Sequence, residues 1–138
     1  MQLHESQYIP LKEALEKDGE LFRYSTVCWS AIKKSAKSSI AAAVGLWFAF
    51  QREWSSVKVI ANDLRQADSR VAYYMRRAII LHPEWRHLVK ITNYKIQLPN
   101  HSIIEAIPID PKGESGGSDD LLIFSEIWGW KNTATLTM

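Results

Sequence analysis

The sequence predicts an α/β fold in which a mainly parallel sheet is flanked by helices. Runs rich in β-branched and aromatic residues alternate with longer helix-like segments along the chain. The longest apolar run, residues 40–50, has the composition of a helix that is buried against a sheet. The 138 residues are enough for one domain with a substantial core.

The first third of the chain predicts a short helix, a strand and a long helix. Residues 11–19 have the pattern of an amphipathic helix that ends at Gly19. Residues 22–32 are rich in aromatic and β-branched side chains, which favours a strand. A basic, hydroxyl-rich turn over residues 33–39 then leads into a helix that we expect from Lys37 to about Trp54.

The remaining elements continue the alternation. Residues 57–61 predict a strand, and Asn62-Asp63 can cap a helix over residues 64–81 that ends before Pro83. The alternating runs 89–98 and 102–107 predict a β-hairpin insertion, joined by residues 99–101. A polar, glycine-containing loop over residues 110–120 precedes the last strand, 121–124. In such a fold, ligands bind at the carboxyl ends of the strands.

Composition excludes several classes of protein. The net charge of +2 is too small to identify a nucleic-acid binder. The single cysteine, Cys28, argues against a disulfide framework and is expected to be a buried thiol in a reducing compartment. The four histidines have no metal-ligand spacing, and residues 40–50 are too few to span a bilayer. Because no signal peptide is apparent, we expect a cytoplasmic protein without membrane partners.

Residues 31–38 have the spacing of the phosphate-binding loop G-x-x-x-x-G-K-[ST], with alanine in both glycine positions. In such a loop, backbone N–H groups hold phosphates, the lysine reaches the β- and γ-phosphate oxygens, and the hydroxyl ligates Mg²⁺. The nucleotide-binding candidates are Lys34, Ser35, Ala36, Lys37 and Ser38, and Ser38 is also the metal ligand.

Alanine at position 36 affects this prediction, because an L-residue in the left-handed region loses about 1–2 kcal/mol. We therefore expect weaker nucleotide binding than with glycine, or a loop that avoids positive φ. The alternative is that Lys33, Lys34 and Lys37 belong to an ordinary solvated helix start.

The apolar run 121–124 ends in Ser125-Glu126, and an acid at this place positions the attacking water in many ATPases. Glu126 is the candidate catalytic base. Ser125 stands where an aspartate supports the metal, and its hydroxyl can hydrogen-bond to a metal-bound water in the outer shell of Mg²⁺. The alternative is a buried strand followed by a solvated acid.

Most of the chain resembles the N-terminal ATPase part of a bacteriophage terminase large subunit, the motor that moves DNA into the procapsid. The resemblance rests on five segments, of which the Glu-hydrophobic-Trp ending is the most specific: the basic loop 33–38, residues 59–63 running into Gln66-Ala67, the hairpin 96–104, the glycine-rich loop, and residues 123–129. It implies a P-loop NTPase core of the ASCE type, with the Walker A motif at 31–38 and the Walker B motif at 121–126.

The resemblance also implies function and partners. It makes the protein a Mg²⁺-dependent ATPase, with ATP as the bound nucleotide and Lys33 in the place of an arginine that senses or stabilises the γ-phosphate. Double-stranded DNA, the portal protein and the terminase small subunit would be its partners, in the cytoplasm of a bacterial host.

Terminase large subunits continue into an RNase H-like nuclease domain, which these 138 residues do not include. We therefore expect a single partial ATPase domain, residues 1–138, with an N-terminal helical segment over 1–20 and a P-loop core over 21–138. The chain resembles a truncated gene, a prophage remnant or a cloned fragment, which can be inactive alone. A sheet that lacks its last strands exposes an edge and apolar area, which favours self-association.

Two other functions are compatible with the sequence. One is a catalytically silent nucleotide-binding or self-associating remnant without turnover. The other is a nucleic-acid-binding fragment, in which tryptophans stack on bases and a basic helix contacts phosphates. We expect the tryptophans to belong mainly to the core or to cover the sheet, and the basic side chains to be a solvated helix face: Arg65, Arg70, Arg76, Arg77, Arg86 and Lys90.

Overall fold

The computed structural model describes residues 2–109 and 118–125. The chain divides into two compact units, Met1–Ser35 and Ala36–Met138. This division lies between Ser35 and Ala36 rather than near residue 20. It therefore falls inside the segment 31–38 that the sequence assigns to a phosphate loop.

The N-terminal unit contains helix α1 (Glu5–Ala14) and a two-stranded hairpin, β1 (Lys17–Asp18) and β2 (Leu21–Phe22). The helix starts earlier than predicted because His4 and Gln7 form a capping box, with the backbone N–H of His4 donating to Gln7 Oε1 at 3.0 Å. Gly19, at φ +68°, does not end a helix. It lies in the hairpin turn instead, where glycine adopts positive φ without strain.

The predicted strand over residues 22–32 is wrong. Only Leu21–Phe22 pairs with another strand, and residues 23–36 adopt neither helix nor strand. High β-propensity does not by itself supply a pairing partner, and most of these side chains are exposed. Cys28 is among the exposed residues, so the prediction of a buried thiol is also wrong.

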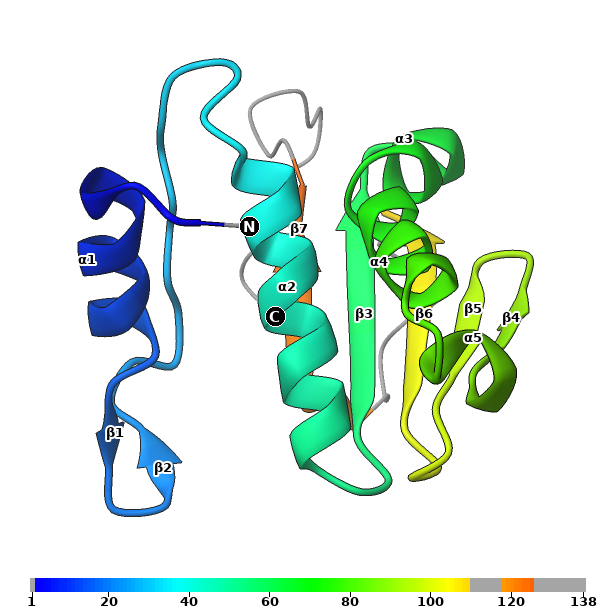
Figure 1. Cartoon of the computed structure of the whole chain (residues 1–138). Coiled ribbons are helices and arrows are strands. Elements are labelled where there is room, and N and C mark those ends of the chain that lie inside the picture. The colour runs from blue at the N-terminus through cyan, green and yellow to red at the C-terminus, as the bar shows by residue number, and fades with distance from the viewer. Residues whose placement is uncertain (1, 110–117, 126–138) are drawn as a thin grey trace. The chain divides into compact units, whose positions relative to one another are not determined.

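The second unit is built around a five-stranded sheet in the order β4-β5-β6-β3-β7 (Figure 1). Its elements in chain order are α2 (Lys37–Gln51), β3 (Ser56–Ala61), α3 (Leu64–Ser69), α4 (Val71–Leu81), α5 (Trp85–Leu88), β4 (Lys90–Thr92), β5 (Lys95–Gln97), β6 (Ile103–Pro108) and β7 (Leu121–Phe124). Strands β6, β3 and β7 are parallel, whereas β4 and β5 are antiparallel to their neighbours. The α/β class is confirmed, and the sheet is mixed.

Helices α2, α3 and α4 lie on one side of this sheet in Figure 1. The core between helices and sheet includes the fully buried side chains of Val57, Met75 and Ile104. Gly45 in α2 allows close packing at this point. A Cβ atom there would clash with Met75 and lie 2.9 Å from Ile123 Cδ1.

Two predicted elements are subdivided in the structure. The helix expected over residues 64–81 breaks at Arg70, whose φ of −113° and ψ of −97° are not helical, and this separates α3 from α4. The hairpin between residues 89–98 and 102–107 exists as the pair β5 and β6. Residues 90–97, however, form a second hairpin, β4 and β5.

Candidate functional site

The carboxyl ends of three parallel strands and the start of α2 lie at the same edge of the sheet. Because only residues 52–55 connect α2 to β3, the helix runs antiparallel to that strand, and its N-terminus returns to the carboxyl edge (Figure 1). This edge therefore carries Lys37 and Ser38 at the start of α2, and Ser125 after β7. The two parts of the predicted site that belong to this unit therefore lie at the same edge of the sheet.

Ala36 precedes α2 with φ 60° and ψ 25°, in the left-handed region. The loop does not avoid positive φ, so the expectation of weaker binding is the one that remains. As the N-cap residue, Ala36 has no side-chain acceptor for the first turn of the helix, and that turn contains no acidic residue. The residue before the first turn therefore contributes no side-chain cap at the positive end of the helix dipole.

The other predicted loop residues belong to the N-terminal unit. Lys33 and Lys34 are exposed, and Lys34 also has a positive φ, 62°. Ser35 accepts a hydrogen bond at its carbonyl from Gln7 Nε2 at 2.9 Å. Among the described residues, its hydroxyl oxygen is buried without a hydrogen-bond partner. A buried hydroxyl without a partner is costly.

Ser125 is buried, and its backbone N–H donates to the carbonyl of Ile60 at 2.8 Å. It therefore continues the pairing of β7 with β3 by one residue and is fixed at the carboxyl edge. Glu126, the predicted base, lies outside the described residues, as do residues 127–129 and the glycine-rich loop 110–117.

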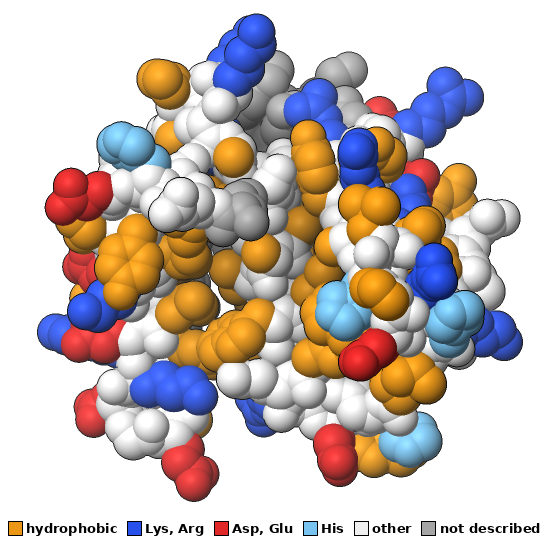
Figure 2. Space-filling view, in the orientation of Figure 1, with side chains coloured by type: hydrophobic (Ala, Val, Ile, Leu, Met, Phe, Trp, Pro, Cys, Tyr) orange, Lys and Arg blue, Asp and Glu red, His pale blue; other side chains and the backbone are white. Residues whose placement is uncertain are grey.

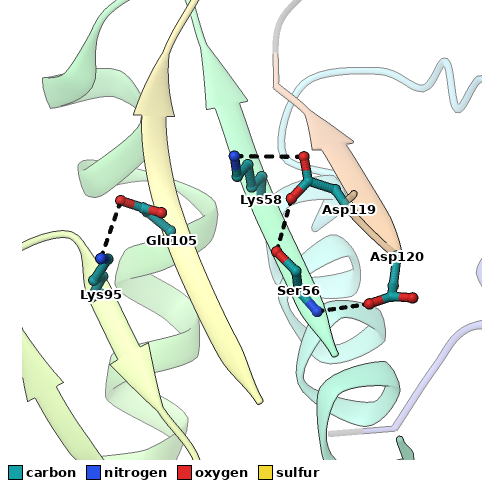
Figure 3. Close-up of polar contacts among 6 residues, drawn as sticks. All are labelled: Ser56, Lys58, Lys95, Glu105, Asp119 and Asp120. Carbon is teal, nitrogen blue, oxygen red and sulfur yellow. Dashed lines mark hydrogen bonds and ion pairs between the residues drawn. The ribbon is translucent and has the colours of Figure 1, made fainter. Parts of the chain in front are cut away.

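The opposite end of β7 is held by contacts that the sequence analysis missed (Figure 3). The hydroxyl of Ser56 donates to Asp119 Oδ1 at 2.8 Å, and the backbone N–H of Ser56 donates to Asp120 Oδ2 at 2.9 Å. Asp119 also pairs with Lys58 at 3.5 Å, where both side chains are half-buried. Both acids belong to the segment 110–120, which is predicted to be a polar loop, but they fasten β7 to β3 and thereby position Ser125.

The described residues offer Mg²⁺ no preformed cage of acids. Within residues 2–109 and 118–125, no group of three or more His, Cys, Asp or Glu side chains is arranged to hold a metal ion. Mg²⁺ at phosphate sites is usually held by few protein groups together with water and phosphate oxygens. The half-buried hydroxyl of Ser38 and that of Ser125 are compatible with such a role.

Two of the described tryptophans are exposed, Trp47 at 36% and Trp54, although these side chains are predicted to belong mainly to the core or to cover the sheet. Trp54 is 72% exposed and stacks on His101, with ring centroids 4.2 Å apart. Both residues have positive φ, 60° and 68°. The prediction failed because α2 ends at Gln51, which leaves Trp54 in the following loop.

Comparison with family models, with curated proteins and with solved structures gives no match for this chain. None of the helices in the described part of the chain is long and apolar enough to cross a membrane.

Proposed function

We propose that this chain binds the phosphates of ATP, together with Mg²⁺, at the start of α2, and hydrolyses ATP as the motor part of a terminase-type ATPase. The observation that carries the proposal is the left-handed conformation of Ala36 directly before Lys37-Ser38. This backbone conformation leads into a helix start without a side-chain N-cap, at the carboxyl edge of three parallel strands. Uncapped helix starts of this kind bind phosphate groups.

The strain at Ala36 is informative because a non-glycine residue at positive φ costs free energy. Strained backbone persists where the surroundings impose it, and it is concentrated at functional sites. Contacts between a phosphate and the N–H groups of the first turn would offset this cost in the bound state. A plain solvated helix start gives no reason for the strain.

Each candidate side chain has a role in this proposal. Lys37 contacts the β- and γ-phosphates, Ser38 holds Mg²⁺, and Ser125 hydrogen-bonds to a metal-bound water. Lys33 stabilises charge at the γ-phosphate, and Glu126 orients the attacking water for in-line displacement. Double-stranded DNA, the portal protein and the terminase small subunit are partners on the strength of the sequence resemblance alone.

One observation favours the second candidate, a nucleotide-binding remnant without turnover. The segment 22–32, which was expected to be the strand before the phosphate loop, is not part of the five-stranded sheet. Lysine at position 33 also lacks the planar, two-pronged donor geometry of an arginine, and serine at 125 removes a negative charge near the metal.

Equilibrium binding of a non-hydrolysable ATP analogue with Mg²⁺ tests the shared part of both candidates. We expect the wild-type chain to bind, and Lys37→Ala to weaken binding at least about tenfold because a charged contact to phosphate is lost. Lys90→Ala, at an exposed position on β4, is the matched control and leaves binding unchanged. A folded wild-type chain that does not bind the analogue contradicts both candidates.

Hydrolysis separates the two candidates. Mg²⁺-dependent ATP turnover that disappears in Glu126→Gln, with binding retained, supports the ATPase. Binding without turnover in the wild-type chain supports the silent remnant.

A further inference from the structure

We propose that the acidic face of α1 in one copy of this chain binds the basic, apolar surface of α4 in a second copy. The two surfaces are defined by exposed residues on one helix each. The α1 face consists of Glu5, Tyr8, Ile9, Lys12 and Glu13, and the α4 hollow consists of Tyr73, Arg76, Arg77, Ile80 and Leu81. This contact is independent of the proposed nucleotide site.

The α4 hollow has a volume of about 290 Å³ and exposes large apolar side chains. Ile80 is 57% exposed and Leu81 is 69% exposed, on the side of α4 opposite its buried residues. Figure 2 shows hydrophobic and basic side chains interleaved over this helix. An exposed apolar surface with a charged rim is typical of a protein interaction site.

The charge of this surface selects an acidic partner. Arg76 is already paired with Asp68 and also donates to the Asp68 carbonyl at 3.1 Å. Arg77 donates to the hydroxyl of Tyr73 at 3.1 Å but forms no ion pair among the described residues. Residues 62–95 contain seven Lys or Arg against three Asp or Glu, a net charge of +4.

The α1 face has the complementary properties. Glu5, Tyr8, Ile9 and Glu13 share one side of the helix at intervals of three and four residues. The exposed Lys12 lies on the same side, so the face carries two acids and one base. Tyr8 is 52% exposed and Ile9 is 55% exposed, between the two acids. Residues 2–20 contain five Asp or Glu against two Lys, a net charge of −3.

These observations favour a second copy of the chain as the partner that binds the α4 hollow, because every copy carries both surfaces. The two surfaces belong to different compact units, which are connected by residues 23–35 without helix or strand. The contact is heterologous, since a different surface is used on each copy. Repeated, it produces a ring or an open filament.

A charge-reversal pair tests the proposal in the full-length chain. Arg77→Glu reverses one charge in the α4 hollow, and Glu13→Arg reverses one charge on the α1 face. Each variant therefore weakens the electrostatic attraction between the two surfaces. We expect analytical ultracentrifugation to show concentration-dependent association of the wild-type chain that weakens at high salt. Each variant alone should associate at least about tenfold more weakly. An equimolar mixture of the two variants should associate again, because the unchanged α1 face of Arg77→Glu can bind the unchanged α4 hollow of Glu13→Arg.

Controls separate this contact from other modes of association. Arg86→Glu reverses an exposed arginine on α5, outside the hollow, and should associate like the wild type. Leu81→Ser should weaken association without changing the circular dichroism spectrum, since this side chain is exposed. A wild-type chain that stays monomeric overturns the proposal. So does association that Arg77→Glu leaves unchanged, or a mixture of the two charge-reversed variants that fails to associate.

Discussion

The two ends of α2 differ in the hydrogen-bond partners that the rest of the chain supplies to their backbone groups. At its C-terminal end, Asn100 Nδ2 donates to the carbonyls of Ala49 and Phe50 at 2.8 and 3.2 Å. The hydroxyl of Ser102 donates to the carbonyl of Arg52 at 2.6 Å. At its N-terminal end, Ala36 offers no side-chain acceptor and is held in a strained conformation. The fold supplies partners for the helix carbonyls, whereas the N–H groups at the start are suited to an external anion.

The largest effect on stability is expected at the C-terminal end of α2, from Ser102→Ala. Ser102 is fully buried, and its hydroxyl also accepts from the N–H and the hydroxyl of Ser55 at 3.0 and 2.9 Å. Removing it leaves the buried N–H and hydroxyl of Ser55 without this acceptor, so we expect a loss of about 3 kcal/mol in the free energy of unfolding. Urea denaturation measures this loss. A change below about 0.5 kcal/mol would show that the network does not hold this end of the helix.

Asn100→Ala is expected to have the next largest effect, about 2 kcal/mol, because two helix carbonyls lose their side-chain donor. Gln97→Ala, at an exposed position on β5, is the control and should change the stability little. Hydrogen exchange should report the loss locally, as faster exchange in the last turn of α2 than in its first turn.

At the other end, Ala36→Gly is expected to stabilise the protein by about 1 kcal/mol, since glycine adopts positive φ without strain. Ala43→Gly is the matched control, because Ala43 is exposed within the same helix. There the same substitution should destabilise by about 1 kcal/mol. Opposite signs in thermal unfolding would confirm the strain at Ala36, and a loss of stability in both variants would contradict it.

The smallest expected effect is the gain in stability that the wild-type chain obtains when it binds the ATP analogue. At a free concentration equal to its Kd, the ATP analogue with Mg²⁺ should raise the free energy of unfolding of the wild-type chain by about 0.4 kcal/mol. At the same concentration the gain should be nearly absent in Lys37→Ala, which binds the analogue more weakly. A gain of equal size in both proteins would place the nucleotide elsewhere.

The elements that were predicted correctly are those whose residues alone, within one continuous segment, indicate a helix or a strand. The apolar run of α2 and the short apolar strands β3 and β7 were recognisable from their own residues. The segment 22–32 was misassigned because a strand requires a partner, and sequence propensity does not indicate one. The break at Arg70 depends on how α3 and α4 pack around the small residues Ala67 and Ala72.

In the candidate site, too, the features that depend on the folded backbone or on distant residues could not be predicted from the sequence. Its spacing identified Ala36, Lys37 and Ser38, but the positive φ of Ala36 became visible only in the structure. The contacts of Asp119 and Asp120 with Ser56 join residues more than sixty positions apart, which no local pattern reveals. Asn100 lies in a loop, and only the fold brings it to the end of α2.

The most direct test of the difference between the two helix ends is an amide NMR titration of the full-length chain with the ATP analogue and Mg²⁺. We expect the largest shifts at the N–H groups of residues 37–39 and little change at residues 49–52 and 100–102. The absence of saturable shifts at residues 37–39, or larger shifts at the C-terminal end of the helix, would contradict the claim that the start of α2 binds phosphate.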